Sequence, residues 1–572
     1  MGIERLISVA RGESPADLLL TNARIVNTFN GEIEEGNVAI CDQRIAGVGD
    51  YQQGQQVIDL KGKYLSPGLI NGHIHTESSM LHISQYARAV VPRGTLAVIT
   101  DFHEIANVCG IRGIKYMMSC AQHLPLDLYL MVPSCVPATH LETSGARLTA
   151  KDIRAILSWE NVIGLGEVMN FPGVIAADEE VLAKIACSRG RVIDGHAPGL
   201  KGTELNAYLS AGILSDHEST SLEEAREKLS KGMYLMIREG SSEEKNLEAL
   251  LPLVTDKTYK RCLFVVDDRS CADLLRDGDI DAVVRKAITL GLDPVRAIQL
   301  ATINSAEYFR LHGLGAIAPG YAANLIVVGD LSTFETEMVF YCGELVAREG
   351  EALFSPPMAE DKEMTRTINI KPFDIEALQI PAEKWTHPTI EIVPNQITTK
   401  KVEERPKVEK GFVLPDIERD ILKLVVVERH RATGNIGLGL VKGFGLKSGA
   451  LASSIAHDSH NIVAVGISDS DIYLAISEVE KLQGGLVIAA DGVVQGSLPL
   501  PIAGLLSPEP LAVVVEKFEK LQGIARELGT RLGDPFATLS FLALPVIPEL
   551  RLTDKGLVDV NAFKLIQGKG KG

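Results

Sequence analysis

Residues 67–79 read Pro67-Gly68-Leu69-Ile70-Asn71-Gly72-His73-Ile74-His75-Thr76-Glu77-Ser78-Ser79, an apolar run that ends abruptly in two histidines. In an extended backbone, residues i and i+2 point to the same face, so His73 and His75 aim at one point. Two converging imidazoles form part of a site for a divalent transition metal, which further His, Asp or Glu ligands must complete. Taken alone, the pair is equally well explained by two surface histidines, because His-x-His is a weak motif.

The chain around this stretch alternates short apolar runs with helical segments such as residues 222–229, where Thr220 and Glu223 have the spacing of a capping box. This alternation is typical of βα units around a parallel sheet. Eight runs can be counted, which predicts an α/β fold with a (β/α)8 TIM-like barrel over residues 63–314. The runs begin at Tyr64, Leu96, Leu128, Val162, Arg191, Ile213, Tyr234 and Cys262.

Polar or ionisable residues follow every one of these runs. The active sites of such barrels lie at the carboxyl ends of the strands, so the side chains would meet at one mouth. A single acid at a strand end is more often a solvated turn residue, but coincidence explains the joint pattern poorly. The strand ends read His73-Ile74-His75, Asp101-Phe102-His103-Glu104, Pro133-Ser134, Glu167, Asp194-Gly195-His196, Asp216-His217-Glu218, Arg238-Glu239-Gly240-Ser241 and Asp267-Asp268-Arg269.

Segments rich in β-forming residues flank the predicted barrel. Residues 1–62 and 315–350 alternate short β-like runs with turn signals, and neither has enough apolar surface to fold alone. We therefore predict one composite β-sandwich built from both flanks. Residues 351–411 are rich in Pro, Lys, Glu and Thr, which predicts a linker. Residues 412–572 combine β-like runs with a helix over 471–482, which predicts an additional C-terminal α+β domain.

The composition excludes several classes of protein. With 572 residues, 46% hydrophobic and 23% charged, the chain has the make-up of a globular protein of several domains. Its net charge of -17 argues against nucleic acid or a membrane as a partner. We find neither a secretion signal nor a long uncharged apolar run, so we expect a cytoplasmic protein. The eight cysteines lack Cys-x-x-Cys spacing, which disfavours zinc ribbons and Cys-ligated base deaminases.

The strand ends supply a set of nitrogen and oxygen ligands for metal. Glu167, on the fourth strand, could bridge two metal ions through its two carboxylate oxygens. The whole pattern resembles the amidohydrolase superfamily over the barrel and both flanks, although many members have a carboxylated lysine where this chain has Glu167. The ligand set is His73, His75, Glu167, His196, His217 and Asp267.

The departure at Glu167 makes the chain similar to the family of bacterial and archaeal adenine deaminases. Shared motifs are Gly164-Leu165-Gly166-Glu167-Val168-Met169-Asn170 and, in the C-terminal domain, Ser453-Ser454-Ile455-Ala456-His457-Asp458-Ser459-His460-Asn461. The resemblance implies hydrolysis of adenine to hypoxanthine and ammonia by metal-activated hydroxide, in purine salvage and adenine catabolism. It favours a binuclear Mn²⁺ or Fe²⁺ centre, while ligands without thiolate also suit Zn²⁺. It further implies a homodimer that acts on a small molecule.

The resemblance also implies which residue accepts the proton of the attacking water. In the superfamily the last aspartate both contacts metal and handles the proton, which makes Asp267 the expected general base. The ring nitrogen N1 of the purine and the departing amine must each be protonated. Glu77, Glu218 and Glu239 are the possible donors, and the sequence does not rank them. We name Asp267, Glu77 and Glu218 as the catalytic set.

The expected substrate-binding residues are Asp268, Arg238, Glu239, Ser241 and His103. Asp268 would suit a hydrogen bond to the purine edge, whereas Arg238 and Ser241 could fix the orientation of the substrate. His103 could be an extra metal ligand, hold the substrate, or support another ligand.

Two rival functions and one domain role stay open. The same barrel and metals serve cyclic amide hydrolases of the hydantoinase or dihydroorotase type, and a non-catalytic scaffold could also keep this fold. In the C-terminal domain His457 and His460 have ligand-like spacing, although a surface loop explains them more simply. Because added domains commonly close active sites, we expect truncation after about Gly350 to leave the metal bound but to impair turnover.

Overall fold

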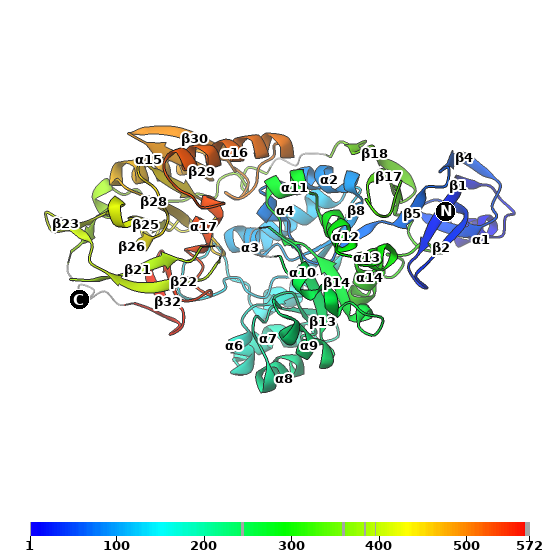
Figure 1. The fold of residues 1–572 in the computed structure, drawn as a ribbon, viewed down its shortest axis with the longest axis horizontal. Coiled ribbons are helices and arrows are strands. Elements are labelled where there is room, and N and C mark those ends of the chain that lie inside the picture. The colour runs from blue at the N-terminus through cyan, green and yellow to red at the C-terminus, as the bar shows by residue number, and fades with distance from the viewer. Residues whose placement is uncertain (1, 242–244, 357–360, 383–384, 395, 567–572) are drawn as a thin grey trace.

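The computed structural model describes residues 2–241, 245–356, 361–382, 385–394 and 396–566 (Figure 1). The N-terminal sheet lies at one end of the molecule, the parallel strands with their helices lie in the middle, and the C-terminal domain lies at the other end. None of the helices that these residues form combines the length and the apolar character needed to cross a bilayer.

The two flanks of the predicted barrel pair with each other in one sheet. Strands from residues 16–67 and 325–352 form the order β19-β18-β17-β16-β5-β1-β2-β3, with β4 beside β1. The junction is the antiparallel pair β16 and β5. A two-layered sandwich stays a prediction. The strands are β1 (Ala16–Asn27), β2 (Glu32–Cys41), β3 (Arg44–Gly49), β4 (Gly54–Asp59), β5 (Tyr64–Pro67), β16 (Leu325–Val328), β17 (Thr336–Tyr341), β18 (Glu344–Arg348) and β19 (Glu351–Ala352).

Both faces of this sheet are covered because its apolar residues alternate. Leu18 and Leu20 of β1 pack into one buried cluster, while Leu19 between them packs into another, on the opposite face. The second cluster contains Val9 of helix α1 (Ile3–Ala10). The sheet therefore has a core on each face: both flanks contribute to the first, whereas the second comes from the N-terminal flank alone.

Parallel strands make up the middle of the molecule. They pair in the orders β6-β8-β9-β10-β11, β12-β13-β14 and β7-β15, and every pair is parallel. The predicted run at residues 64–71 is divided between β5 of the outer sheet and β6. The strands are β6 (Leu69–Asn71), β7 (Ile74–His75), β8 (Thr95–Thr100), β9 (Asp127–Val132), β10 (Val162–Val168), β11 (Val192–Gly195), β12 (Ser215–Asp216), β13 (Tyr234–Arg238), β14 (Cys262–Val265) and β15 (Asp267–Asp268).

Helices alternate with these strands along the chain, as the sequence predicts. Helix α9 starts where expected, but its cap is Ser221, whose hydroxyl accepts a hydrogen bond from Glu224 N, and not the predicted pair of Thr220 and Glu223. The helices are α2 (Ile83–Val90), α3 (His103–Cys109), α4 (Ile111–Ala121), α5 (Ala150–Ile156), α6 (Phe171–Ile175), α7 (Glu179–Cys187), α8 (Gly202–Ser210), α9 (Leu222–Ser230), α10 (Leu247–Leu250), α11 (Cys271–Arg276), α12 (Ile280–Thr289), α13 (Pro294–Leu300) and α14 (Ile303–Phe309).

The C-terminal domain is built on an eight-stranded sheet with the order β22-β21-β26-β25-β28-β27-β29-β30. Two of these strands, β21 and β22, come from the segment 351–411 that the sequence predicts as a linker. They are hard to predict because only Ile390 and Ile392 bury apolar side chains among charged neighbours. Residues 357–360, 383–384 and 395 of that segment lie outside the described residues.

The remaining elements of this domain follow in chain order. Helix α15 has Ser468 as its cap and begins at Asp469, two residues before the predicted start at Asp471. The elements are β20 (Ile380–Pro381), β21 (His387–Ile392), β22 (Thr399–Glu404), β23 (Lys407–Glu409), β24 (Phe412–Leu414), β25 (Ile421–Val427), β26 (Ile436–Lys442), β27 (Ala450–Ser453), β28 (Ile462–Gly466), α15 (Asp469–Lys481), β29 (Gly485–Ala490), β30 (Val493–Pro499), α16 (Leu511–Glu527), α17 (Pro535–Phe541), β31 (Leu550–Thr553), β32 (Gly556–Asp559) and β33 (Lys564–Leu565).

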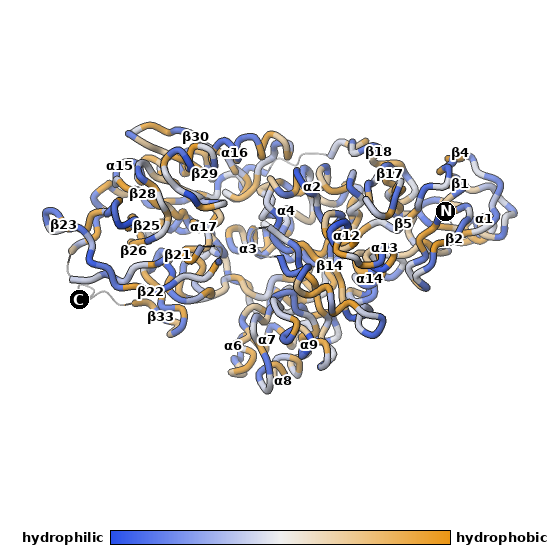
Figure 2. Tube along the Cα trace, in the orientation of Figure 1, coloured by the Kyte–Doolittle hydropathy of each residue, from blue (hydrophilic) through white to orange (hydrophobic). Residues whose placement is uncertain are grey.

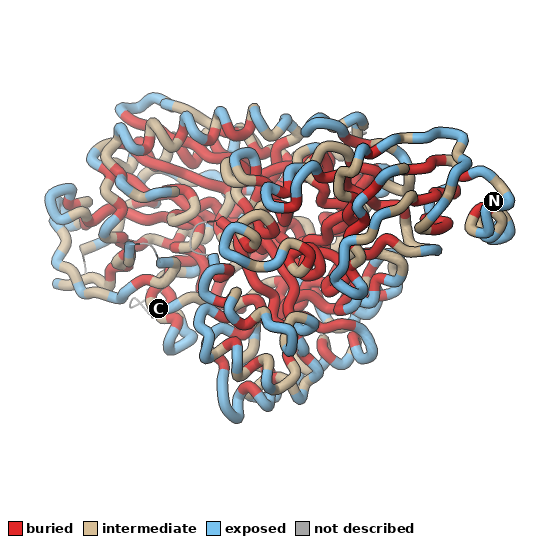
Figure 3. Tube along the Cα trace, turned by 45° about the vertical axis from the view of Figure 1, so that its right-hand side comes forward, coloured by how far each residue is buried: buried red, intermediate tan, exposed pale blue. Residues whose placement is uncertain are grey.

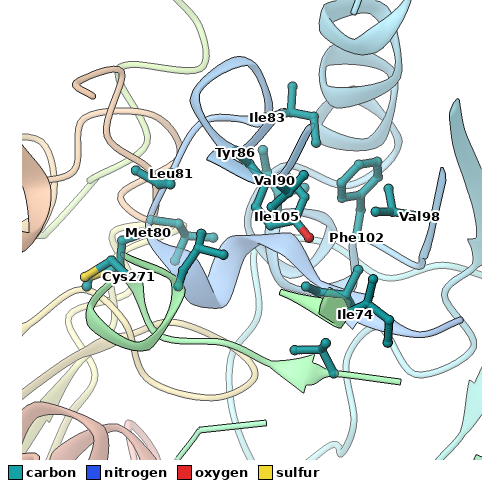
Figure 4. Packing of buried hydrophobic residues seen from close by; sticks show 14 of the residues in the cluster. Ile74, Met80, Leu81, Ile83, Tyr86, Val90, Val98, Phe102, Ile105 and Cys271 are labelled. Carbon is teal, nitrogen blue, oxygen red and sulfur yellow. The ribbon is translucent and has the colours of Figure 1, made fainter. Parts of the chain in front are cut away.

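One apolar core runs from the parallel strands into the C-terminal domain. It contains Leu81 and Phe102 on one side, and Leu506 and Phe518 on the other. Hydrophobic stretches (Figure 2) and buried stretches (Figure 3) occur in both parts of the molecule. Figure 4 shows the part of this cluster around Ile74 and Phe102. Backbone hydrogen bonds join the two parts directly, from His82 N to Ser507 O at 2.9 Å and from Ser507 N to Met80 O at 2.7 Å. The C-terminal domain is therefore packed on the strand ends and not merely tethered to them.

Candidate active site

The first and last parallel strand ends meet at the predicted histidine pair. In the parallel pair β7 and β15, Ile74 lies opposite Asp267 and His75 opposite Asp268. The backbone N–H of Asp267 donates to His73 O at 2.9 Å. Asp267 has a φ of 67°, in the left-handed region that Asp tolerates better than most residues and that is often found at functional sites. This turn points the Asp267 carboxylate back toward the two histidines.

The two carboxylate oxygens of Glu167 face different histidines. Glu167 Oε2 lies 2.7 Å from His196 Nδ1 and 3.3 Å from His217 Nε2. The other oxygen, Oε1, lies 3.3 Å from His75 Nε2. A carboxylate placed in this way has the geometry needed to bridge two neighbouring ions. The side chain is buried at the end of β10, so water does not compete for these contacts.

Asp267 faces the histidine pair on the other side of the cluster. Its Oδ1 lies 3.1 Å from His75 Nε2 and 3.4 Å from His73 Nε2. His73 Nε2 is buried and makes no hydrogen bond within the described residues, although it faces this carboxylate. A buried imidazole nitrogen without a partner is costly unless it has another ligand. The nitrogen and carboxylate donors gathered here fit divalent metal ions.

The charges of the cluster hold its acids in the ionised form. Burial alone would raise the pKa of Glu167, but hydrogen bonds from His196, His217 and His75 outweigh it and hold that pKa well below its usual range. Burial alone would also raise the pKa of Asp267, but Arg238 and the neighbouring histidines outweigh burial and hold this pKa well below its usual range. Both carboxylates are therefore available as anionic ligands at neutral pH.

Asp101 is a residue whose role the sequence did not suggest. Its carboxylate oxygen Oδ1 lies 3.2 Å from His75 Nδ1 and 3.1 Å from His103 Nδ1. A carboxylate on the outer nitrogen of a metal-ligating histidine fixes the tautomer and the ring orientation. His103 itself lies 3.7 Å from Glu167, at the border of the ligand cluster. The signal was the spacing of Asp101 and His103, which places both at the end of β8.

A small cavity of about 130 Å³ adjoins the cluster. Ligand pockets for larger molecules usually measure about 300–1,000 Å³, so this one suits a small ligand. Three of the predicted residues, Glu77, Asp268 and Ser241, line it. Burial and the nearby Glu104 raise the pKa of Glu77 to about 7. Burial and the neighbouring Asp267 also raise the pKa of Asp268, whose carboxylate accepts a hydrogen bond from Ser78.

Three other predicted residues lie outside the lining of the small cavity and pair with charged neighbours. Arg238 Nη1 lies 2.5 Å from both Glu218 Oε1 and Asp267 Oδ2, so its guanidinium connects two acids of the cluster. Glu218 lies beside the histidines, 3.4 Å from His217 Nε2. Glu239 pairs with Lys286 at 2.5 Å. Among the described residues that line the small cavity, Arg238, Glu218 and Glu239 are absent.

The C-terminal domain supplies a large part of the wall of the cavity. His457 and His460 line it together with Phe541 and Ser540 of the same domain. Both histidines bind the carboxylate of Glu104, which follows β8. The sequence leaves these histidines open between a ligand-like pair and a surface loop, because nothing local indicates a contact with a residue about 350 positions earlier in the chain.

Comparisons with known proteins place the chain in a family. The family model "Amidohydrolase family" matches residues 64–346, and the model "Adenine deaminase C-terminal domain" matches residues 396–564. An adenine deaminase from Dehalococcoides mccartyi is 63% identical over 564 residues, which is 99% of each chain. Adenine deaminase 2 from Carboxydothermus hydrogenoformans is 51% identical over 565 residues, again 99% of each chain. An adenine deaminase from Halalkalibacterium halodurans is 45% identical over 576 residues, 99% of this chain and 98% of the relative.

The similarity extends over both the strand ends with their ligand cluster and the C-terminal domain that closes the cavity. Because relatives this similar match the chain over nearly its full length, the chain belongs to the adenine deaminase family of the amidohydrolase superfamily.

Proposed function

We propose that this protein is a metal-dependent adenine deaminase that hydrolyses adenine to hypoxanthine and ammonia. The observation that carries the proposal is the full-length similarity to adenine deaminases. It is combined with a cluster of His, Asp and Glu side chains beside a cavity of about 130 Å³, which Asp268, the neighbour of Asp267, lines. A purine base is a small, planar and polar heterocycle, which suits a small cavity lined by carboxylates and aromatic rings.

The proposed metal ligands are the four histidines and two acids of the cluster. Two of the possible metal-holding groups in it share His73: one combines it with Glu167 and His217, the other with His75 and Asp267. We propose a binuclear Mn²⁺ or Fe²⁺ centre in this position, with Zn²⁺ as the alternative that the donor set also suits. When bound, such ions lower the pKa of a water molecule enough to supply hydroxide near neutral pH. We also propose that the parallel strands that carry these ligands close into one (β/α)8 barrel.

We propose Asp267 as the residue that accepts a proton from water and Glu77 as the residue that donates a proton to the purine. Asp267 is ionised and stands among the metal ligands, so it can accept a proton from the attacking water. Glu77 lines the cavity, where a carboxyl group could deliver a proton to N1 of the purine. Glu218 lies against the histidines and Arg238, outside the cavity lining. We therefore rank Glu77 above Glu218 and Glu239 as the donor to the ring.

Asp268 and Ser241 are the proposed contacts to the substrate from the strand ends. Both line the cavity, and the Asp268 carboxyl accepts from Ser78, which fixes its direction. Arg238 and Glu239 are better described as residues that hold the site, since each is paired with other charged groups. His103 is held by Asp101 at the edge of the metal cluster and would orient its neighbours.

The test is an assay of the purified protein loaded separately with Mn²⁺, Fe²⁺ and Zn²⁺. Adenine should yield hypoxanthine and ammonia in equal amounts, while hydantoin and dihydroorotate should not be opened. Opening of either cyclic amide without deamination would favour the rival hydrolase, and a protein that acts on none of them would fit the non-catalytic scaffold. The homodimer and the cytoplasmic location stay predictions, which sedimentation and cell fractionation can check.

A further inference from the structure

One acid of the strand ends holds two histidines of the C-terminal domain. Glu104 Oε1 lies 2.7 Å from His457 Nδ1, and Glu104 Oε2 forms a short contact with His460 Nε2. Glu104 and both histidines line the small cavity. This contact brings a part of the chain with no assigned role to the wall of the proposed substrate pocket.

The hydrogen bonds of His460 use both of its ring nitrogens. Its Nδ1 accepts from the backbone N–H of Ala456 at 3.2 Å, so the proton of the neutral ring is on Nε2 and is donated to Glu104. The side chain is 1% exposed. His460 therefore has no nitrogen left for a ligand and acts on the position of Glu104.

The arrangement of His457 leaves one nitrogen free. Its Nδ1 faces the Glu104 carboxylate, and its ring stacks on Phe541 with 4.9 Å between the ring centres and 21° between the planes. The side chain is 16% exposed, against 3% for Glu104, and it lines the cavity. No other described residue forms a hydrogen bond with Nε2. The ring is thus held on one edge and one face, in a side chain that lines the cavity and leaves Nε2 available to a ligand.

We propose that His457 is a substrate-binding residue which donates an Nε2–H hydrogen bond to an acceptor nitrogen of the purine ring, with Glu104 and His460 as positioning residues. This proposal rests on adenine as the substrate. It gives the C-terminal domain a direct part in recognition of the base.

The charges around the cavity support a donor at this place. Among the described residues that line it, His457 and His460 are the only basic side chains, while Glu77, Glu104, Asp268 and Asp534 are acidic. Burial alone would lower the pKa of His457, but the facing Glu104 outweighs it and raises that pKa to about 9. Carboxylates suit the N–H groups of a purine. The acceptor nitrogens N3 and N7 of the purine need a hydrogen-bond donor. Of the two histidines, His457 has an N–H, at Nε2, that no described residue accepts.

The test compares His457→Phe with the unchanged enzyme on adenine, 3-deazaadenine and 7-deazaadenine. Phenylalanine keeps the stack on Phe541 but has no donor. We expect KM for adenine to rise about 10- to 100-fold with a much smaller change in kcat, because a hydrogen bond to a charged group is lost from both the bound substrate and the transition state. In the unchanged enzyme, one of the two deaza analogues should inhibit more weakly than the other by a similar factor. In His457→Phe this difference should disappear.

Two further variants separate recognition from folding. His457→Gln retains an amide donor and should recover part of the affinity. His140→Phe replaces an exposed histidine that also packs on an aromatic ring, Phe563, and should leave KM and kcat unchanged. Metal content and thermal unfolding are measured for all variants. Should His457→Phe fail to fold, the analogue comparison is made on His457→Gln, which then must show a reduced difference.

The results that would overturn the proposal are specific. An unchanged KM and an unchanged difference between the analogues in His457→Phe would exclude His457 from binding. A loss of metal with no change in the preference among analogues would give it a structural role instead. If the unchanged, metal-loaded enzyme does not deaminate adenine at all, the proposed function fails, which is a different outcome from a failure of His457 alone.

Discussion

The carboxylate of Glu167 lies 2.7 Å from His196 Nδ1, and this contact ties the fourth strand end to the fifth. The second oxygen of the same carboxylate faces His75 on the first strand end, at 3.3 Å. One side chain thus connects ligands that lie on both sides of the site. The position of Glu167 is therefore the one from which a single carboxylate could contact two metal ions.

The first prediction concerns this bridge. Glu167→Gln should lose metal as well as turnover, because an amide is neutral and a much poorer bridging ligand. Metal content by elemental analysis and adenine turnover are measured on the same preparation, with the exposed Glu160→Gln as the control. Full metal content in Glu167→Gln would contradict the bridging role.

The second prediction concerns Asp267. Asp267→Asn should reduce turnover by about 10²–10⁴, the usual contribution of general acid–base catalysis, and should weaken metal binding through the lost contact to the histidine pair. Steady-state kinetics in excess metal separate the two effects. Activity within about tenfold of the unchanged enzyme would mean that another carboxylate carries the proton.

The third prediction concerns a buried lysine that holds two histidine-bearing loops. Lys228 Nζ lies 2.9 Å from Asp216 Oδ2 and 2.7 Å from Ala197 O, next to His217 and His196 respectively. Lys228→Met leaves the Asp216 carboxylate without its cation, which should cost about 3–5 kcal/mol of unfolding free energy. Metal affinity should also fall by about 10- to 100-fold.

The control for this change is Lys231→Met, at the partly exposed residue that follows the last residue of α9 and pairs with Glu227. It should alter the unfolding free energy by less than about 0.5 kcal/mol. Denaturant unfolding measures both variants. Equal effects of the two substitutions would show that the buried pair of Lys228 and Asp216 contributes no more to stability than a surface ion pair does.

The fourth prediction is a pH effect on stability. His82 is buried at the start of α2, and burial lowers its pKa from 6.5 to about 4. Below about pH 6.5 the unfolded chain binds a proton that the folded protein excludes, so stability should fall by about 3 kcal/mol as the pH drops from about 6.5 to about 4. Above about pH 6.5 the ring is neutral in both states and this effect is absent.

His82→Asn keeps an acceptor for Ser84 N at the helix cap but cannot be protonated. The difference in Tm between the unchanged protein and this variant should therefore change between pH 7.5 and pH 5, in favour of the variant at low pH. A difference that is constant with pH would remove His82 as the source.

The ligand cluster could be predicted from the sequence because each ligand follows an apolar run that forms a strand. Spacing alone places His73 and His75 together, and the barrel rule places the later strand ends near them. The substrate wall could not be predicted in this way. Glu104 and His457 come together only because the C-terminal domain packs on the strand ends, and the sequence contains no local sign of that packing.

The same packing changes how the C-terminal domain can be tested. The sequence suggests truncation after Gly350, but the apolar core is shared between Phe102 on one side and Phe518 on the other. Truncation would expose this surface to water, and loss of activity would then report unfolding. Single substitutions at His457 avoid that ambiguity, because they leave the shared core intact.

If metal held by this cluster is needed to hydrolyse adenine in the adjoining cavity, turnover must follow metal content. The most direct measurement is the rate of hypoxanthine and ammonia release from adenine, made on metal-free protein and on the same protein after titration with Mn²⁺ or Fe²⁺. We expect no turnover without metal, and turnover that saturates near two ions per chain. Turnover that does not depend on added metal, or no deamination of adenine by the fully loaded protein, would contradict it.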